Sequence, residues 1–446
     1  MPSSPHVIVI GAGTGGMCLA HGLLQAGISV AVYEADHTRK DGLYGYRVGI
    51  DPDGSRALAA CLPPELFDIF VATCARAPRY FNILTERDRP VLSLKLPPDT
   101  DPIDSEKSVS RMTLRQVLLT GLEEVVQFGK RFTHYEHEAD GRVTAYFTDG
   151  TWATGDVLVA ADGTGSRVRK QYLPHAELVE AGVISVAAKV PVTERSKALL
   201  SREIFEGLSL VFAPKGYFNI FHVMEFKWDR EGHAKQSIGG NEKDLIDNWP
   251  GLLYDNTRDY INWGFAAATD RFPPDVMKMR GTELANLVLE MTPDWAPNYR
   301  ELFRLTEPST CFPINIMTSK PIPQWETTNV TLIGDAIHTM TPGRGVGANT
   351  ALRDAALLAK NLARAVTGHM TMRQAIRDYE TQMIKYGFDA VKASLEQQGG
   401  DGMLHKPVVG RVALGAMRSG LRLVNHLPPM KAAFAKNLLN SRKNED

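Results

Sequence analysis

The spacing of apolar residues changes several times along the chain, and each spacing predicts a different element. Helical periodicity runs through 14–26 and 349–365. Runs that are wholly or mostly apolar, typical of parallel strands covered on both faces, precede these helices and recur elsewhere. Strands that alternate with helices in this way predict a doubly wound α/β unit. The apolar runs are 7–10, 28–33, 156–161 and 330–333.

A second pattern lies between these segments. Apolar and polar residues alternate there with a period of two, as in strands with one buried face. These segments predict a mixed β-sheet inserted into the α/β unit, with helices near 241–253 and 280–292. The Pro- and Asp-rich stretch 97–105 predicts a surface loop. The alternating segments are 79–96, 183–192, 203–213, 217–226, 236–240 and 261–268.

The last fifty residues combine apolar positions at helical spacing with many cations. We expect a C-terminal helix that packs on the core and turns a basic side to solvent. Contact of a basic amphipathic helix with a membrane surface is the alternative. The apolar positions are Val408, Val409, Val412, Leu414, Met417, Leu421 and Val424. The cations are Arg411, Arg418, Arg422, Lys431, Lys436, Arg442 and Lys443.

Composition and charge narrow the class of protein. At 446 residues the chain is long enough for two or more domains. Its formal net charge of −1 gives no overall field that would recruit nucleic acid or acidic lipid. The four cysteines form no CxxC pair, so we expect neither disulfides nor a metal site. The first strand begins almost at once, and no apolar run approaches the roughly 20 residues of a membrane span. We therefore expect a soluble cytoplasmic protein.

A glycine pattern follows the first apolar run. Gly11, Gly13 and Gly16 have the GxGxxG spacing, which permits a tight turn, approach of a pyrophosphate and packing of helix on strand. Glu34 ends the next run, where a carboxylate accepts hydrogen bonds from an adenosine ribose. A lone GxGxxG also occurs in ordinary glycine turns, but here both strands, the helix and the acid are in register. The pattern predicts FAD or NAD rather than NADP.

A second element begins where the run 330–333 meets Gly334 and Asp335, and it continues through a Gly/Pro-rich loop at 342–347. A carboxylate at the end of this strand can bond the hydroxyls of a ribityl chain. The loop lets backbone N–H groups approach a flavin ring, and the next helix directs its positive end at the negative charge of reduced flavin. NAD needs no such element, so the combination favours FAD.

A third element follows the run 156–161, where Asp162 and Gly163 precede Ser166 and arginines at 167 and 169. With all three motifs in this order, residues 6 to 390 resemble the FAD-dependent aromatic monooxygenases of the para-hydroxybenzoate hydroxylase type. The resemblance implies a discontinuous FAD-binding domain, a substrate domain and a C-terminal helical segment. Their expected bounds are 1–78, 106–176 and 308–394; 79–105 and 177–307; and 395–446.

The resemblance also implies roles for individual residues. Asp335 would hold the ribityl chain, and Asp162 with Gly163 would serve the FAD and the access of the nicotinamide cofactor. Arg111 would open a helix and reach the FAD, and Arg47 would lie beside the flavin, although a solvated position is the alternative for both. The ADP half of FAD would be held by Gly11, Gly13, Gly16 and Glu34, and the pyrimidine edge of the ring would be lined by Gly347, Ala348 and Asn349.

Two further positions belong to the same loop. His338 follows Gly-Asp-Ala-Ile, as a histidine often does in the family it resembles, and we expect it to support the loop structurally. Arg344 stands where this loop more often carries a small or polar residue, and its role, in a substrate pocket or in loop packing, stays open.

The function that the resemblance implies is that of a single-component monooxygenase using FAD and NADH or NADPH. Reduced flavin would react with O₂ at C4a, and the hydroperoxide would transfer one oxygen atom to an aromatic or other electron-rich apolar molecule, in secondary metabolism or aromatic catabolism. Baeyer–Villiger oxidation, epoxidation, antibiotic inactivation, a reductase or oxidase, and a non-catalytic flavoprotein stay open. Halogenation is disfavoured, because the motif Gly-Trp-x-Trp-x-x-x-Pro is absent.

No motif identifies the catalytic residues. Deprotonating a phenol needs a base near the flavin, and the weak candidates, each with a structural alternative, are Arg47, Lys189, His222, Tyr217 and Asn219. Aromatic and apolar side chains of the expected sheet would form a substrate wall, although such residues are more often core. They are Phe205, Phe212, Phe218, Trp263, Phe265, Phe312 and Met317.

Overall fold

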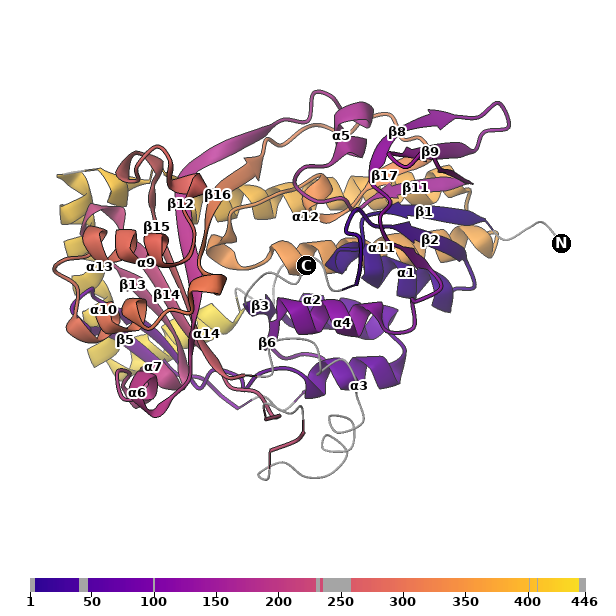
Figure 1. The fold of residues 1–446 in the computed structure, drawn as a ribbon. Helices are drawn as coiled ribbons and strands as arrows, with labels where there is room; N and C mark the ends of the chain where they lie inside the picture. Colours follow the sequence, from indigo (N-terminus) through magenta and orange to yellow (C-terminus); the bar gives the residue numbers. More distant parts are fainter. Residues whose placement is uncertain are drawn as a thin grey trace.

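The computed structural model describes residues 5–39, 47–98, 101–229, 233–235, 258–400, 402–406 and 408–440. Two large sheets stand side by side, one parallel and surrounded by helices, the other longer and mixed (Figure 1). The predicted fold class is confirmed: a Rossmann-like unit with an inserted mixed sheet and a C-terminal helical segment. The strand expected at 236–240 and the helix expected at 241–253 lie outside the described residues.

The parallel sheet has the strand order β17–β11–β1–β2–β7. Its central strand, β1, pairs in parallel with β11 on one side and β2 on the other, so its apolar run is covered on both faces. The carboxyl ends of β1, β11 and β17 therefore meet at one edge. The strands are β1 (His6–Ile10), β2 (Ser29–Tyr33), β7 (Val126–Gln127), β11 (Val157–Ala160) and β17 (Val330–Leu332).

Helices cover this sheet, and α1 and α11 pack on each other beside it (Figure 1). The first helix ends before Gly27, whose φ of +69° stops the helix. The helices are α1 (Thr14–Gln25), α2 (Pro52–Cys61), α3 (Pro64–Ala72), α4 (Arg111–Leu119), α5 (Arg167–Tyr172), α11 (Gly347–Val366) and α12 (Met372–Gln398). A small antiparallel sheet adjoins them, with strands β8 (Phe132–His137), β9 (Val143–Phe147) and β10 (Trp152–Gly155).

The mixed sheet has the order β16–β12–β15–β14–β13–β4–β5. Its outermost strand, β16, was not predicted, and it lies within 308–394, so this part of the expected FAD-binding domain completes the sheet of the other unit. The strands are β4 (Tyr80–Leu84), β5 (Pro90–Lys95), β12 (Leu178–Pro191), β13 (Gly207–Phe212), β14 (Phe218–Met224), β15 (Tyr260–Ala268) and β16 (Phe312–Ser319).

The segment 203–213, predicted as one strand, begins as a helix. Ser201 caps α7 (Arg202–Phe205), because its side chain accepts a hydrogen bond from the Ile204 N–H, and Glu203 stands in the first turn. The strand starts only at Gly207. Other helices of this unit are α6 (Glu194–Lys197), α9 (Gly281–Met291) and α10 (Pro297–Arg304).

The two faces of the mixed sheet serve different purposes. On β14, Phe221 and Val223 point to α9 and α10 and form a buried core with them. Their neighbours Phe218 and Ile220 point to the opposite face, which looks toward the parallel-sheet unit. This alternation follows from the two-residue repeat of a strand, and it decides which side chains can reach a site between the two sheets.

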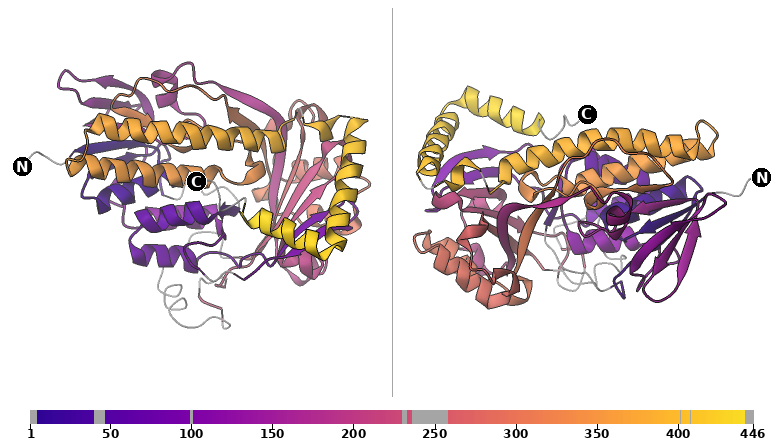
Figure 2. Two further views of the ribbon diagram at one scale, coloured as in Figure 1. Left: turned by 180° about the vertical axis from the view of Figure 1, so that it is seen from behind. Right: turned by 90° about the horizontal axis from the view of Figure 1, so that it is seen from above.

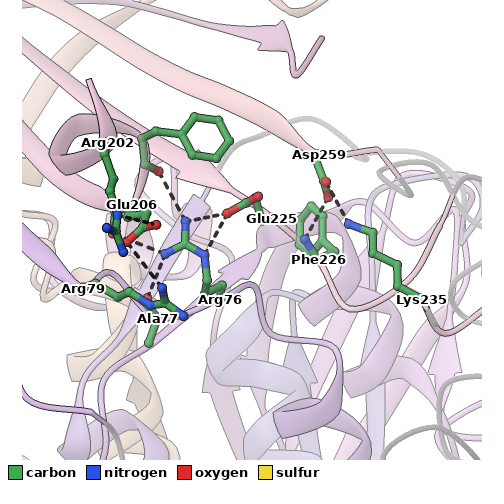
Figure 3. A network of polar contacts seen from close by, with 10 residues as sticks. Arg76, Ala77, Arg79, Arg202, Glu206, Glu225, Phe226, Lys235 and Asp259 are labelled. Carbon is green, nitrogen blue, oxygen red and sulfur yellow. Dashed lines mark hydrogen bonds and ion pairs between the residues drawn. The ribbon is translucent and has the colours of Figure 1, made fainter. Parts of the chain in front are cut away.

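A cluster of ion pairs joins the two units, and a short ladder lies where the chain returns to the α/β unit. The ladder consists of β3 (Arg47–Ile50) and β6 (Lys107–Ser110). Arg76, between α3 and β4, donates to the Glu225 carboxylate from Nε at 2.8 Å and from Nη2 at 2.5 Å, and further to the carbonyls of Phe205 and Glu206 (Figure 3). The end of β14 is thereby fixed to the chain that leaves the α/β unit.

The C-terminal helices α13 (Val409–His426) and α14 (Pro428–Asn440) run along the outside of the mixed sheet (Figure 2). α13 contacts β5, and α14 contacts α13 and runs off at a wide angle to it (Figure 2). Arg418 on α13 pairs with Glu86 and donates to the Phe212 carbonyl, so the helix is held by polar as well as apolar contacts. None of the described helices combines the length and apolarity that crossing a bilayer requires.

Candidate functional site

The turn between β1 and α1 is built around the three glycines of the first motif. Gly11 has φ +104°, and a Cβ there would lie 2.4 Å from the Ala161 carbonyl oxygen, so only glycine fits. A Cβ on Gly16 would lie 2.3 Å from the Gly11 carbonyl oxygen, which shows how closely α1 approaches the turn. The nearest atom to a Cβ on Gly13 would be 3.8 Å away. The protein therefore leaves open space at the one glycine that a pyrophosphate would approach.

Glu34 lies beside this turn, directly after β2. Its Oε2 accepts a hydrogen bond from the Ala12 N–H at 2.7 Å, and its Oε1 accepts one from the Asp36 N–H at 2.9 Å. The two bonds fix the carboxylate, and each oxygen keeps acceptor capacity for a ligand hydroxyl. This is the position that a ribose-binding carboxylate needs.

Asp335 lies in a 3₁₀ turn (Gly334–Ala336) at the carboxyl end of β17. Gly334 has φ +60°, and a Cβ there would lie 2.9 Å from a side chain of α11, so the turn passes close against that helix. The Asp335 side chain is exposed, yet protein surrounds it, and this desolvation raises its pKa. Three cations oppose this rise: His338, Arg111 and Arg169.

Arg169 links the second and third motifs. Its Nη1 donates to the Ala336 carbonyl at 2.8 Å and its Nη2 to the Thr164 carbonyl at 2.9 Å. Burial lowers the pKa of the guanidinium, whereas the carboxylates of Asp162 and Asp335 raise it. The side chain thus ties together the loops that follow β11 and β17 and balances their two negative charges.

Asp162 has one oxygen that the described part of the chain leaves unsatisfied. Its Oδ2 accepts from the Arg167 N–H at 2.8 Å, but Oδ1 is buried without a hydrogen-bond partner there. Burial raises the pKa of this carboxyl, and hydrogen bonds from Ser166 and the start of α5 oppose the rise. A buried orphan acceptor at the end of a parallel strand is what a ligand hydroxyl would satisfy.

Both arginines that the sequence proposed lie at this edge. Arg111 begins α4, is exposed and acts electrostatically on Asp335. The Arg47 side chain is only 14% exposed, so the solvated alternative does not apply to it. Its Nε donates to Ser108 Oγ at 2.9 Å, and its Nη2 lies 3.4 Å from Glu106 Oε1. The guanidinium is therefore held in one orientation on the β3–β6 ladder.

The start of α11 presents polar backbone groups to the same region. A 3₁₀ turn (Pro342–Arg344) leads into the helix, and Val346 at the N-cap offers no side-chain acceptor. The first-turn N–H groups, including those of Gly347 and Ala348, therefore keep the positive end of the helix available for a ligand. This arrangement fits the negative pyrimidine edge of a flavin.

Asn349 departs from the expected arrangement in one respect. Its Nδ2 donates to the Gly49 carbonyl at 3.0 Å and the Gly345 carbonyl at 3.2 Å, and its Oδ1 accepts from the Asp51 N–H at 3.1 Å. The side chain thus joins α11 to the β3–α2 segment. Only the backbone of Asn349 remains to face a ligand.

A buried polar cluster lies beneath the Asp335 turn. Asp354 on α11 accepts from the Gly334 N–H at 2.7 Å and from the Tyr386 hydroxyl at 2.6 Å, and its Oδ2 lies 2.6 Å from His338 Nε2. Burial lowers the pKa of His338, but Asp354 and Asp335 raise it more, so the net direction is upward. This geometry agrees with the structural role expected for His338.

A cavity of about 240 Å³ opens between the α11 loop and the mixed sheet. Its apolar floor comes from strands β4, β13 and β14, its polar wall from the β3 segment, and its opposite side from the loop that contains Arg344. Leu438 of α14 and Gln397 of α12 close it. The floor residues are Phe81, Leu208, Leu210 and Ile220, and the wall includes Arg47, Asp51, Asp53 and Glu106.

The remaining catalytic candidates do not line this cavity. His222 and Lys189 lie on the correct face of the sheet but are buried, and Lys189 stacks over the Tyr260 ring at 4.6 Å. Burial and the charges of Arg47 and Arg76 hold the pKa of His222 well below its usual value, so its ring is neutral. Tyr217 packs edge-on against Phe265 in the core toward α10, on the far face, and Asn219 shares that face.

The expected aromatic wall is also corrected. Trp263 and Phe265 are buried in the core with α10, and Phe205 on α7 belongs to the same core. Phe212 and Phe218 face the α/β unit but pack on each other with tilted rings, whose centres are 5.2 Å apart, outside the cavity lining. Phe312 and Met317 lie on β16, also outside it. The alternating pattern did not indicate which face of each strand would meet the site.

Three residues of the site were not identified by sequence reasoning. Arg169 follows the capping Ser166 by three residues, a spacing that was visible but was given no role. Asp354 follows Gly347 by seven residues, so both lie on one face of α11, which was a usable signal. Leu438 carries no local signal, because only the return of α14 brings it to the cavity.

The residues at this edge fit FAD. Each part of the cofactor has a matching feature: the fixed Glu34 carboxylate for the adenosine ribose, open space at Gly13 for the pyrophosphate, the exposed Asp335 for the ribityl chain and the uncapped start of α11 for the ring. When bound, FAD would supply the redox chemistry.

Comparison with known proteins agrees with this fit. A family model described as FAD binding domain matches residues 308–394. A solved structure from Photorhabdus luminescens, described as a FAD-containing monooxygenase, is 33% identical, with 88% of this chain and 97% of that chain covered and a TM-score of 0.76. HpxO of Klebsiella pneumoniae, solved with FAD and uric acid, shares the fold at 23% identity, with coverage of 99% and 97% and a TM-score of 0.76.

A curated relative is longer than this chain. The dual O-methyltransferase/FAD-dependent monooxygenase of Cercospora beticola is 30% identical over 85% of this chain but only 44% of its own length. The chain thus spans less than half of such dual-function relatives. Three observations agree: the three motifs, the geometry of the site, and the likeness to the Photorhabdus protein over nearly its whole length. The chain belongs to the family of FAD-dependent monooxygenases of the para-hydroxybenzoate hydroxylase type.

Proposed function

We propose that this chain is a monooxygenase that uses NADH or NADPH to insert one atom of O₂ into a compact aromatic or other electron-rich apolar molecule. The observation that carries the proposal is the cavity of about 240 Å³, which joins the flavin-binding start of α11 to an apolar floor. This volume lies below the roughly 300–1,000 Å³ of pockets for drug-sized ligands, which favours a substrate of one or two rings.

The residues that line the cavity have different roles. Phe81, Leu208 and Ile220 exclude water from one side and offer a flat apolar surface to a ring. Leu438 shields the outer side. By excluding water, these residues would protect the chemistry that a bound flavin supplies from side reactions.

Arg47 is the residue that we propose for orienting the substrate. Ser108 and Glu106 hold its guanidinium at the cavity wall, so it can direct a donor toward an oxygen substituent without first losing conformational freedom. Lys189 and His222 do not line the cavity, and we assign the proton chemistry of the substrate to neither.

The identity of the substrate is proposed only as a chemical class. The Klebsiella structure contains uric acid, a compact planar molecule, and its fold matches this chain. An apolar floor with one oriented arginine suits a planar ring with an oxygen or nitrogen substituent. The family that the chain belongs to also supports NADH or NADPH as the reductant.

The deciding experiment is the visible spectrum of the purified protein, followed by anaerobic addition of NADH and then NADPH with panels of phenols, indoles and quinones. We expect flavin bands that bleach faster with one ligand class, and incorporation of isotopically labelled O₂ into that ligand when air is admitted. Reduction by nicotinamide without label in any product would contradict a monooxygenase and favour a reductase or oxidase. Absence of flavin would contradict the whole assignment.

A further inference from the structure

The exposed apolar side chains of this protein are concentrated at the C-terminus. Twelve large apolar side chains are exposed in the described part of the chain, and seven of them lie on or beside α13 and at the start of α14. Elsewhere, the five exposed ones are scattered singly, as is normal for a protein surface. The seven are Met403, Val408, Val409, Val412, Leu423, Leu427 and Met430.

These side chains form a stripe on the outer face of α13. At 100° per residue, Val408, Val412 and Leu423 fall within an arc of roughly 60°. Exposed Ala416 lies at the edge of this arc and widens it to roughly 80°. Val408 is 75% exposed, Val412 69% and Leu423 56%. The inner face of the helix is satisfied separately, by buried Leu414 and by contacts on the mixed sheet. The stripe is therefore not the face by which α13 holds to its own protein.

Cations border this stripe. Exposed Arg411 and Arg422 lie about 40–60° around the helix axis from Val408, on one side of the stripe. Lys406 and Lys436 are exposed nearby. From Met403 to Asn444 the sequence contains eight Lys and Arg and neither Asp nor Glu, whereas the chain as a whole carries −1. The weak overall charge thus conceals a strongly basic end opposed by an acidic remainder.

The combination of an outward apolar stripe with bordering arginines selects one kind of partner. A second copy would bring two such basic surfaces together, which like-charge repulsion opposes. An anionic lipid surface offers both an apolar phase for the stripe and acidic headgroups for the arginines. The helix lies along the outside of the molecule, where a flat surface can reach it (Figure 2).

We propose that the outer face of α13 and the start of α14 dock on an anionic lipid surface. Val408, Val412 and Leu423 enter the boundary between headgroups and acyl chains, and Arg411 and Arg422 lie at headgroup level. The inner side of the same helix pair reaches the cavity through Leu438, so docking places the cavity wall close to the lipid. This proposal does not depend on the oxygenation chemistry.

The test is cosedimentation of the intact, flavin-loaded protein with vesicles. We expect binding to phosphatidylcholine containing about 30% phosphatidylserine, little binding to phosphatidylcholine alone, and about ten-fold weaker binding when NaCl rises from about 0.05 to 0.5 M. Val412→Asp/Leu423→Asp and Arg411→Gln/Arg422→Gln should each weaken binding about ten-fold. The matched control is Trp152→Asp, which removes an exposed apolar side chain far from α13 and should bind as the unchanged protein does.

Flavin absorbance and the thermal midpoint of each variant confirm folding, and the salt titration needs no variant at all. The proposal fails if the unchanged protein does not sediment with the anionic vesicles, or if Val412→Asp/Leu423→Asp binds them as well as the control. A concentration-dependent dimer in sedimentation velocity that Val412→Asp/Leu423→Asp dissociates would overturn it too, because the stripe would then belong to a second copy.

Discussion

At the scale of single residues, the site is organised by carboxylates at the ends of neighbouring strands. Asp162 follows β11 and Asp335 follows β17, and the two strands pair in parallel, so both carboxylates lie at one edge. Arg169 bonds both loops and lies between the two charges. The charges of both carboxylates raise the pKa of the Arg169 guanidinium, which burial lowers, so this side chain is the cation that the two loops share.

Asp335→Ala should give largely colourless protein, because the exposed acceptor for the ribityl hydroxyls is lost and the charge balance with Arg169 is disturbed. Flavin absorbance of the purified variant, measured relative to protein absorbance, is the readout. The matched control is Asp156→Ala, at the amino end of β11, whose carboxylate accepts from the His6 N–H and which should remain yellow. A fully loaded, yellow Asp335→Ala protein would remove the main anchor of the FAD assignment.

The His338–Asp354 pair predicts a pH dependence of stability. Because the pKa of His338 is raised in the folded protein, the pair contributes fully below the unfolded value of about 6.5, and the contribution is lost as the pH rises through the raised pKa. The thermal midpoint should therefore fall as the pH rises above 6.5, and less steeply in His338→Gln. Exposed His175→Gln serves as control. Equal slopes in all three proteins would show that the pair does not titrate as described.

At the scale of elements, the cavity depends on strands whose two faces do different work. Residues of β14 alternate between the core with α10 and the cavity, so a shift of the strand by one residue would exchange the two sets. The cavity is then closed in part by an element from the far end of the chain, α14.

Leu438→Trp should therefore change substrate use without changing flavin binding. A larger side chain at this wall reduces a cavity of about 240 Å³, and we expect KM for the best substrate to rise about ten-fold or more, since a misfit of 1–3 kcal/mol corresponds to this factor. Asn437→Trp, one residue away and exposed, is the matched control. If both variants behave alike, α14 does not shape the pocket.

At the scale of the whole molecule, the two sheets must keep a fixed distance for flavin and substrate to meet. The Arg76 cluster contributes to this, because it joins the chain that leaves the α/β unit to the end of β14 in the mixed sheet (Figure 3). The distribution of charge is also a property of the whole molecule. The net charge of −1 does not reveal that the C-terminal segment is strongly basic.

Arg76→Ala should lower the free energy of unfolding by about 1–3 kcal/mol, the cost of leaving the Glu225 carboxylate and two carbonyls without a charged donor. Arg79→Ala, which removes an arginine that is 59% exposed and pairs with Glu206, should cost less than about 1 kcal/mol. Chemical denaturation, monitored by the release of flavin, measures the free energy of unfolding of each variant. Equal costs would show that the Arg76 cluster does not stabilise the junction.

The amino-acid sequence was sufficient to predict features whose geometry depends on residues close together in the chain. Gly11, Gly16 and Glu34 could be assigned because a strand, a turn and a helix fix their geometry within about 25 consecutive residues, and a pyrophosphate turn has few solutions. The same holds for Asp335 at the end of β17 and for the α/β class of the fold, which follows from the order of apolar runs.

Contacts between side chains far apart in the sequence, in contrast, could be read only from the folded protein. The face that each strand of the mixed sheet turns to the cavity depends on its pairing register, so the sequence offered Trp263, Phe265 and Tyr217 only as candidates, and the structure places all three in the core with α10. The Asn349 amide is consumed by Gly49 and Asp51, nearly 300 residues away in sequence. The apolar stripe on α13 became visible only once packing had covered the other face, because amphipathic spacing gives the angle between faces and not what each face meets.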